Sequence, residues 1–194
     1  MKSYSAANLL GKEMQSQHIG ERLSSFFSSV FNKEAEIELA VEVPQSVYLR
    51  TRLMCEFLET NYELPVSIGE FVSALFIDFI HRNMKKHNPK KVCDELTKYV
   101  KPTESLEIND PMNNKIYLVK KKEHSSFIVG FTIDKVNIRR GEMILAEIDE
   151  LTGNYYTVEE LISRLWNNFV KAYADGSNEK AIEKIFKMIS THLN

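Results

Sequence analysis

The chain has little of several things that mark particular protein classes. Its two cysteines, Cys55 and Cys93, are too few for a disulfide framework and lack metal-ligand or redox spacing, so we expect a cytoplasmic location. Seven glycines and five prolines exclude a low-complexity linker protein. The first residues lack the plan of a signal peptide, and no apolar run approaches the roughly 20 residues that span a bilayer. We therefore expect neither secretion nor a membrane partner.

A strong excess of one charge is also absent, since 25 basic and 27 acidic side chains give a net charge of −2. This near balance excludes a polybasic protein that coats nucleic acid everywhere, but it allows a local basic face. With 194 residues, of which 43% are apolar and 27% charged, the composition is that of a globular chain with one large or two small domains.

Motifs for catalysis and metal binding are missing as well. The five histidines have no i, i+4 partner suited to zinc, and there is neither a phosphate-binding glycine-rich loop nor a Gly-x-Ser-x-Gly elbow. Acids near expected strand ends are the one set that suggests a metal-dependent nuclease: Asp134, Glu142, Glu147 and Asp149. Such acids are common in any α+β domain, so we expect no enzyme, no metal and no cofactor.

The first part of the chain changes from helical periodicity to a period of two. Residues 1–35 form an N-terminal arm with one helical apolar stripe, from Ile19 to Phe31. From Glu36 to Val43, apolar residues alternate with glutamate and alanine, which indicates a strand with one buried face. Pro44 ends this strand, because proline cannot donate to a ladder but can open a helix.

Two helices are expected after this strand. The first turns its apolar residues inward, among them Leu49, Leu53 and Phe57. A capping box, Ser67-Ile68-Gly69-Glu70, begins the second, which is apolar nearly all round from Phe71 to Ile80. Such a helix must be covered from several sides, which one short strand and helix cannot do. We therefore expect a partner chain to cover it.

A basic stretch and a loop separate this module, residues 36–101, from the rest of the chain. The basic stretch occupies residues 81–101, and its lysines include Lys85, Lys86, Lys90 and Lys91. The loop is expected at residues 103–114, which are rich in proline, asparagine and aspartate, and it marks the candidate domain boundary.

Residues 102–194 are expected to form a small α+β domain, an antiparallel sheet with two C-terminal helices. Strands are predicted at 116–119, 127–133 and 143–148, the last being apolar on both faces and therefore central. A second capping box, Thr157-Val158-Glu159-Glu160, begins a helix that Asp175-Gly176-Ser177 ends, and a final helix follows. We expect no internal repeat.

The predicted elements follow one another in the order strand, proline, helix, loop and capped apolar helix. The residues that define this order are 37–44 and 67–72, with Leu75 and Phe79. This order resembles the ribbon-helix-helix family of DNA-binding repressors over about residues 36–84. Members of that family are obligate dimers in which the strands of two chains pair as a ribbon and four helices interlock. The resemblance therefore implies a homodimer or higher oligomer, whose ribbon enters the major groove of double-stranded DNA.

The resemblance also implies a set of DNA-binding residues. Outward side chains of the ribbon meet base edges, and the N-terminus of the second helix holds a phosphate. In this sequence those positions are Glu38, Ala40, Glu42 and Ser67. The basic stretch adds Lys85, Lys86, Lys90 and Lys91, which either contact phosphates or form a solvated helix end that complements the helix dipole.

Two functions fit these patterns. The first is a dimeric DNA-binding regulator of plasmid, phage or mobile-element type, whose C-terminal domain serves oligomerisation or sensing; the basic stretch favours it. The alternative is a non-enzymatic assembly or adaptor protein that uses the ribbon-helix-helix fold only for dimerisation. The acidic outward face of the ribbon favours the alternative, because carboxylates there would face a field of phosphates.

Overall fold

The computed structural model describes residues 2–17, 35–86, 88–97, 106–110, 115–119, 125–176 and 180–192. The helical stripe expected between Ile19 and Phe31 lies outside these residues. The described elements, in chain order, are α1 (Leu9–Gln17), β1 (Glu36–Pro44), α3 (Gln45–Tyr62), α4 (Ile68–Lys85), α5 (Pro89–Thr97), β2 (Leu106–Asp110), β3 (Lys115–Val119), β4 (Ser126–Asp134), α6 (Lys135–Thr152), α7 (Val158–Ala174) and α8 (Ala181–His192). Helices and antiparallel strands occur together, which confirms the α+β class.

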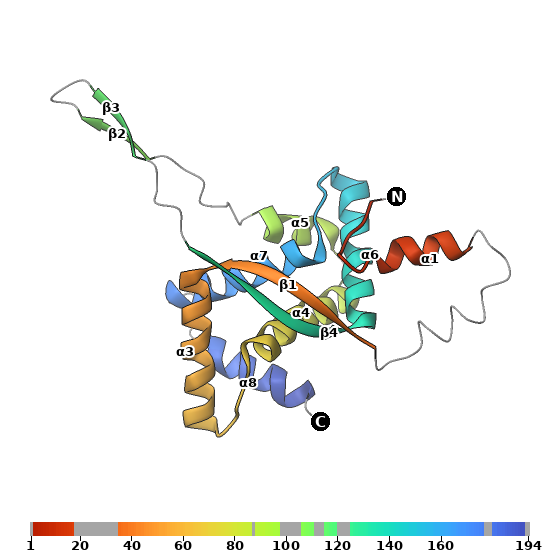
Figure 1. Cartoon of the computed structure of the whole chain (residues 1–194), viewed down its shortest axis with the longest axis horizontal. Helices are drawn as coiled ribbons and strands as arrows, with labels where there is room; N and C mark the ends of the chain where they lie inside the picture. Colours follow the sequence, from red (N-terminus) through yellow and green to blue (C-terminus); the bar gives the residue numbers. More distant parts are fainter. Residues whose placement is uncertain are drawn as a thin grey trace.

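A two-stranded antiparallel ribbon, made of β1 and β4, lies across the helices (Figure 1). Its register pairs Glu36 with Asp134 and Pro44 with Ser126, so Ala40 lies opposite Gly130 at the centre. Both strands belong to one chain, so the expected ribbon between residues 36–43 of two chains is wrong. The expected sheet of a separate C-terminal domain is wrong for the same reason, because β4 pairs with β1.

The chain contains an internal structural repeat, which the sequence analysis missed. The unit strand, 18-residue helix, loop and capped helix begins at Glu36 and again at Ser126, 90 residues later. The register of the ribbon has the same symmetry. Glu36 pairs with Asp134, and their equivalents in the other half, Ser126 and Pro44, pair with each other. Within this unit, residues 36–85 and 126–175, few residues are identical at this spacing: Arg50 and Arg140, Glu70 and Glu160, Ser73 and Ser163, Leu75 and Leu165, Phe79 and Phe169.

The two halves are interlocked rather than stacked side by side. The Ser73 hydroxyl on α4 donates to the Thr132 carbonyl on β4, and its counterpart Ser163 on α7 donates to the Glu42 carbonyl on β1. Each capped helix is thus bound to the strand of the other half. The first helix of one half also contacts the capped helix of the other half, since the indole of Trp166 on α7 donates to Thr51 Oγ1 on α3 at 2.7 Å.

The counterpart of this last contact involves Gly141 on α6 and Phe76 on α4. A Cβ atom at Gly141 would lie 2.8 Å from the Phe76 ring, so only glycine lets the aromatic side chain of the other half approach this closely. Buried apolar residues from both halves form one continuous core. Folding of either half therefore depends on the other.

The nearly all-apolar helix α4 is covered by its own chain. It contacts β4, α3, α6, α7 and α8, and Phe71, Phe76, Phe79 and Ile80 are fully buried. The expected need for a partner chain to cover this helix is wrong, because the second half of the chain takes that place. None of the described helices is both long and apolar enough to cross a membrane.

Two local expectations also fail. Residues 143–148 lie within α6 and are not a central strand; Ile144, Leu145 and Ile148 are buried at helical spacing because α6 packs against α1, α4, α5 and α7. On α3, Leu49, Leu53 and Phe57 are exposed rather than inward, whereas Val47, Met54 and Leu58 are buried.

The region between the halves holds a second, separate pair of strands, β2 and β3. The strand expected at 116–119 is confirmed as part of β3. The loop expected at 103–114 is wrong for residues 106–110, which form β2, and its other residues lie outside the described part of the chain.

The two halves end their first helix differently, and this difference is open to a stability test. Both α3 and α6 end at a residue in the left-handed conformation, Glu63 with φ of 53° and Gly153 with φ of 72°. A side chain is disfavoured in that conformation, whereas glycine adopts it readily. We expect Glu63→Gly to raise the free energy of unfolding by about 0.5–1 kcal/mol in urea titrations, because relief of strain exceeds the added entropy of the unfolded chain.

The matched control is Glu59→Gly, an exposed position in the interior of the same helix. The free energy of unfolding of this variant is expected to be lower than that of the wild-type chain by about 1 kcal/mol, because glycine has a low helix propensity. Equal destabilisation by both substitutions would show that Glu63 is not strained.

Candidate nucleic-acid interface

The outward face of the ribbon carries the residues expected to read bases. Glu38, Ala40 and Glu42 are all exposed, as expected, and alternate with the buried Leu39, Val41 and Val43. Opposite them on β4 lie Thr132, Gly130 and Ile128, in that order. The structure thus brings the three predicted positions together on one surface, with a second strand that the sequence analysis had placed in another domain.

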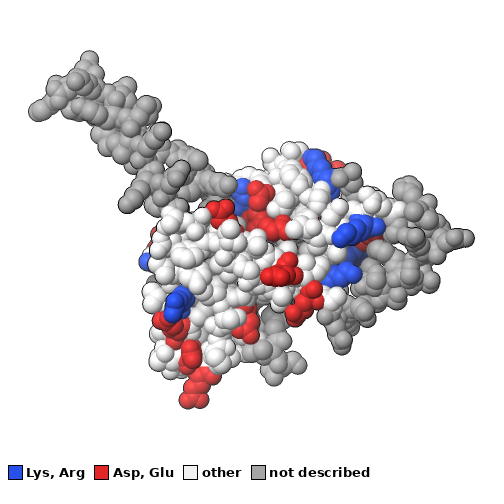
Figure 2. All heavy atoms as spheres, viewed as in Figure 1, with Lys and Arg blue, Asp and Glu red and all other residues white. Residues whose placement is uncertain are grey.

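This surface is acidic. Its outward positions are Glu36, Glu38, Ala40 and Glu42 on β1 and Ser126, Ile128, Gly130 and Thr132 on β4, with neither lysine nor arginine among them. Figure 2 shows acidic side chains across the centre of this face, where Figure 1 places the ribbon, and basic side chains mainly toward its edges. A hydroxyl of the second strand, Ser126 Oγ, donates to Glu42 Oε1 at 2.5 Å and so helps to hold the carboxylate in place.

The N-terminus of α4, expected to hold a phosphate at Ser67, is occupied by a carboxylate of the chain itself. Glu70 Oε2 accepts from the Ser67 amide at 2.8 Å and from the Ser67 hydroxyl at 2.7 Å, which completes the predicted capping box. The same box is formed at α7 by Thr157 and Glu160. A phosphate at either helix end would meet a negative charge at the position where the helix dipole favours one.

The four lysines of the basic stretch form a separate exposed group at the turn between α4 and α5. Lys85 ends α4, Lys86 caps it, and Lys90 and Lys91 lie in the first turn of α5. No ion pair within the described residues includes them. Lys85 follows Ser73, which contacts β4, by 12 residues and hence by about 18 Å along the helix axis. The lysines therefore do not extend the ribbon face.

The acids considered for a nuclease are distributed along α6 and have structural partners. Asp134 caps the helix through the Val136 amide at 3.0 Å. Glu142 is fully buried and accepts from the amides of Leu9 and Leu10, the first residues of α1. Within the described residues, no cluster of three or more acidic, histidine or cysteine side chains has the arrangement of a metal site.

Asp149 fastens the first residues of the chain to α6. It accepts from Lys2 Nζ and from the Tyr4 hydroxyl, both at 2.8 Å. These two hydrogen bonds lower the pKa of Asp149, and burial together with the Asp149 carboxylate raises the pKa of Tyr4 to about 12. Asp149 thus anchors the N-terminal arm to α6.

Sequence reasoning missed that β4 completes the ribbon face. Ile128, with 76% of its surface exposed, is the most exposed large apolar side chain described, and it lies opposite Glu42. A signal was present: the capping boxes at Ser67 and Thr157 are 90 residues apart, and each follows an alternating strand by the same interval. That spacing would have revealed the repeat.

Comparison with known proteins adds no further constraint. No protein-family model matches the chain, and neither curated proteins nor solved structures give a match.

Proposed function

We propose that this chain is a non-enzymatic adaptor whose acidic ribbon face binds a basic segment of a partner protein in the cytoplasm. In this proposal, the two halves are a single-chain counterpart of the ribbon-helix-helix dimer. The observation that carries it is the charge of the outward ribbon positions, which include Glu36, Glu38 and Glu42 but no lysine or arginine.

The likeness to a ribbon-helix-helix dimer rests on the reciprocal contacts between the halves. The strands pair antiparallel about the Ala40–Gly130 pair, each is followed by two helices, and each second helix is bound to the opposite strand through Ser73 or Ser163. An arrangement of this kind is what two copies of such a module produce when they share one core. A tether between the copies removes the concentration dependence of a dimer.

Electrostatics favours a basic protein segment over DNA as the ligand of this face. Duplex DNA carries one negative charge per roughly 1.7 Å of its axis, so three glutamates in the major groove would be repelled. Glu70 and Glu160 add carboxylates at the two helix N-termini that would otherwise accept phosphates. A lysine- or arginine-rich segment would instead gain charge-assisted hydrogen bonds from the glutamates.

The shape of the ribbon suits an extended segment. At the centre of the face, Ala40 and Gly130 have small side chains or none, so an extended segment can approach the backbone there. The exposed Ile128 next to them offers one apolar contact. A segment with an apolar residue between basic residues would cover Ile128 while its charges reach the glutamates.

The test is a triple substitution, Glu36→Gln, Glu38→Gln and Glu42→Gln, titrated with a fluorescent 12-residue peptide of alternating lysine and leucine. We expect the variant to bind at least tenfold more weakly than the wild-type chain at 50 mM salt, because each charge-assisted hydrogen bond lost costs about 1.5–3 kcal/mol. The control replaces three exposed acids on and after α3, Glu56, Glu59 and Glu63, by glutamine. If the ribbon variant and the control bind the peptide equally, the ribbon is not the site.

A second candidate function, DNA binding in a regulator, is favoured by the exposed group Lys85, Lys86, Lys90 and Lys91. These lysines would contact the phosphate backbone away from the ribbon, with no base readout required. Four phosphate contacts give a salt slope of about −3.6, so affinity for a mixed-sequence duplex would fall about 10²-fold between 50 and 200 mM salt.

Replacing the four lysines by alanine should abolish both the binding and its salt dependence in a fluorescence anisotropy titration. Replacing Arg50 and Arg52 on α3 by alanine, the control, should leave them unchanged. Absence of duplex binding by the wild-type chain at 50 mM salt would eliminate this candidate.

A further inference from the structure

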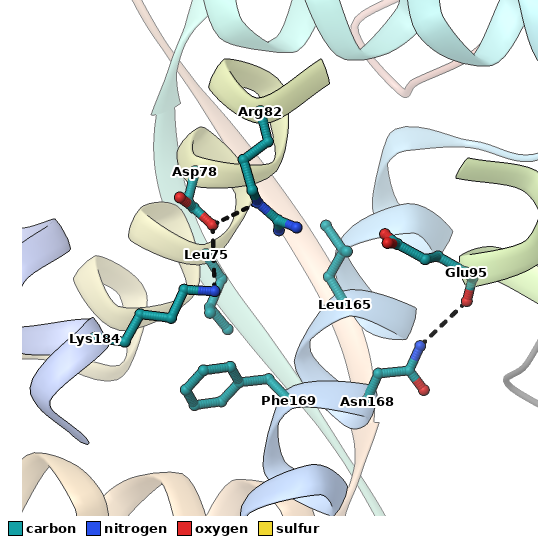
Figure 3. A pocket seen from close by; sticks show the side chains of 8 residues that line it. All are labelled: Leu75, Asp78, Arg82, Glu95, Leu165, Asn168, Phe169 and Lys184. Atoms are coloured by element: carbon teal, nitrogen blue, oxygen red, sulfur yellow. Dashed lines mark hydrogen bonds and ion pairs between the residues drawn. The ribbon is translucent and has the colours of Figure 1, made fainter. Parts of the chain in front are cut away.

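A pocket of about 310 Å³ lies between α4, α5, α7 and α8 (Figure 3). Its apolar lining comes from Leu75, Leu165 and Phe169. Leu75 and Leu165 are equivalent residues of the two halves, so the pocket lies where the halves meet. Its volume is at the lower end of the range of small-molecule sites in proteins.

One side of the pocket has a surplus of positive charge. Asp78 accepts from Arg82 Nε at 2.8 Å and lies 3.7 Å from Lys184 Nζ, so one carboxylate serves two cations. The guanidinium of Arg82 is directed toward the pocket, and the Lys184 chain enters from α8 (Figure 3). A guanidinium has five N–H donors, and only Nε–H is taken by Asp78 among the described contacts. The remaining donors suit a carboxylate.

The opposite side carries a single negative charge, that of Glu95 on α5. Its backbone carbonyl accepts from the Asn168 side chain at 3.3 Å, which fixes α5 against α7 at this point. The Glu95 carboxylate points over the pocket (Figure 3), and no ion pair involving it is found within the described residues. This carboxylate suits an ammonium group.

We propose that the pocket binds a free α-amino acid with an apolar side chain. Its carboxylate would pair with Arg82 and Lys184, its ammonium with Glu95, and its side chain would pack on Leu75, Leu165 and Phe169. A simple anion would leave Glu95 unpaired, and a simple cation would leave the surplus positive charge unpaired. A ligand with both charges and an apolar part matches the cations, the carboxylate and the apolar residues of the lining at once.

Such a ligand would contact both halves of the chain and therefore stabilise the folded state. At a concentration of 100 times its Kd, binding to the folded state alone raises the Tm of a chain of this size by about 5–10 °C. This effect is independent of any partner on the ribbon, so the site can be tested whether or not the proposed adaptor function holds.

The experiment is isothermal titration calorimetry with L-leucine and L-phenylalanine, together with thermal unfolding. Isopentylamine, which lacks the carboxylate of leucine, and 4-methylpentanoate, which lacks its ammonium group, serve as matched ligands. We expect both amino acids to bind, and each leucine analogue to bind at least tenfold more weakly than leucine. Absence of binding by both amino acids would overturn the proposal, as would equal binding of leucine and either analogue.

Variants locate the binding. Glu95→Gln should lower the affinity for leucine at least tenfold and leave the affinity for 4-methylpentanoate unchanged, because only the ammonium group of leucine loses its partner. Glu183→Gln, an exposed position on α8 outside the pocket lining, is the control and should leave leucine binding intact. If Glu95→Gln binds leucine as tightly as the control does, the assignment of the ammonium to Glu95 is wrong.

Discussion

The pairing of β1 with β4 is the constraint on which the rest of the structure depends. It joins two segments 90 residues apart and places each capped helix under the strand of the other half. Because the apolar faces of α4 and α7 are covered only when both halves are present, neither half has a complete core alone. The contacts of Thr51 with Trp166 and of Gly141 with Phe76 fix this crossed arrangement at the level of single side chains.

Local patterns predicted the elements well where one face is buried. The alternation from Glu36 to Val43, the second alternation at 127–133 and both capping boxes are confirmed, because each depends on residues close in the sequence. Residues 143–148 were mistaken for a strand because a helix packed on several sides is apolar at adjacent positions as well as at helical spacing.

What the sequence analysis could not supply was the pairing partner of each strand. An apolar helix such as α4 indicates that a cover exists, but not whether that cover is a second chain or a later part of the same one. The repeat remained hidden because few residues are identical between the halves, although the order of elements and the two caps are preserved. Half of the ribbon face was consequently unknown, including Ile128.

The candidate site shows how one architecture can present different chemistry. A carboxylate, Glu70 or Glu160, occupies the N-terminus of the capped helix in both halves. On the ribbon, the outward glutamates lie on β1 alone, whereas the outward residues of β4 are uncharged, and four exposed lysines lie at the turn between α4 and α5. In the proposed function, charge at these positions, rather than the backbone arrangement, decides which partner the ribbon accepts.

The central claim, that one chain closes its own ribbon, is tested most directly by a disulfide between the opposed central positions. In the double variant Ala40→Cys, Gly130→Cys, the thiols face each other across an antiparallel pair at a separation that a disulfide spans. Peptide mapping after mild oxidation of a dilute sample should find a 40–130 bond within chains of monomeric mass. Disulfide-linked dimers as the main product would contradict the account.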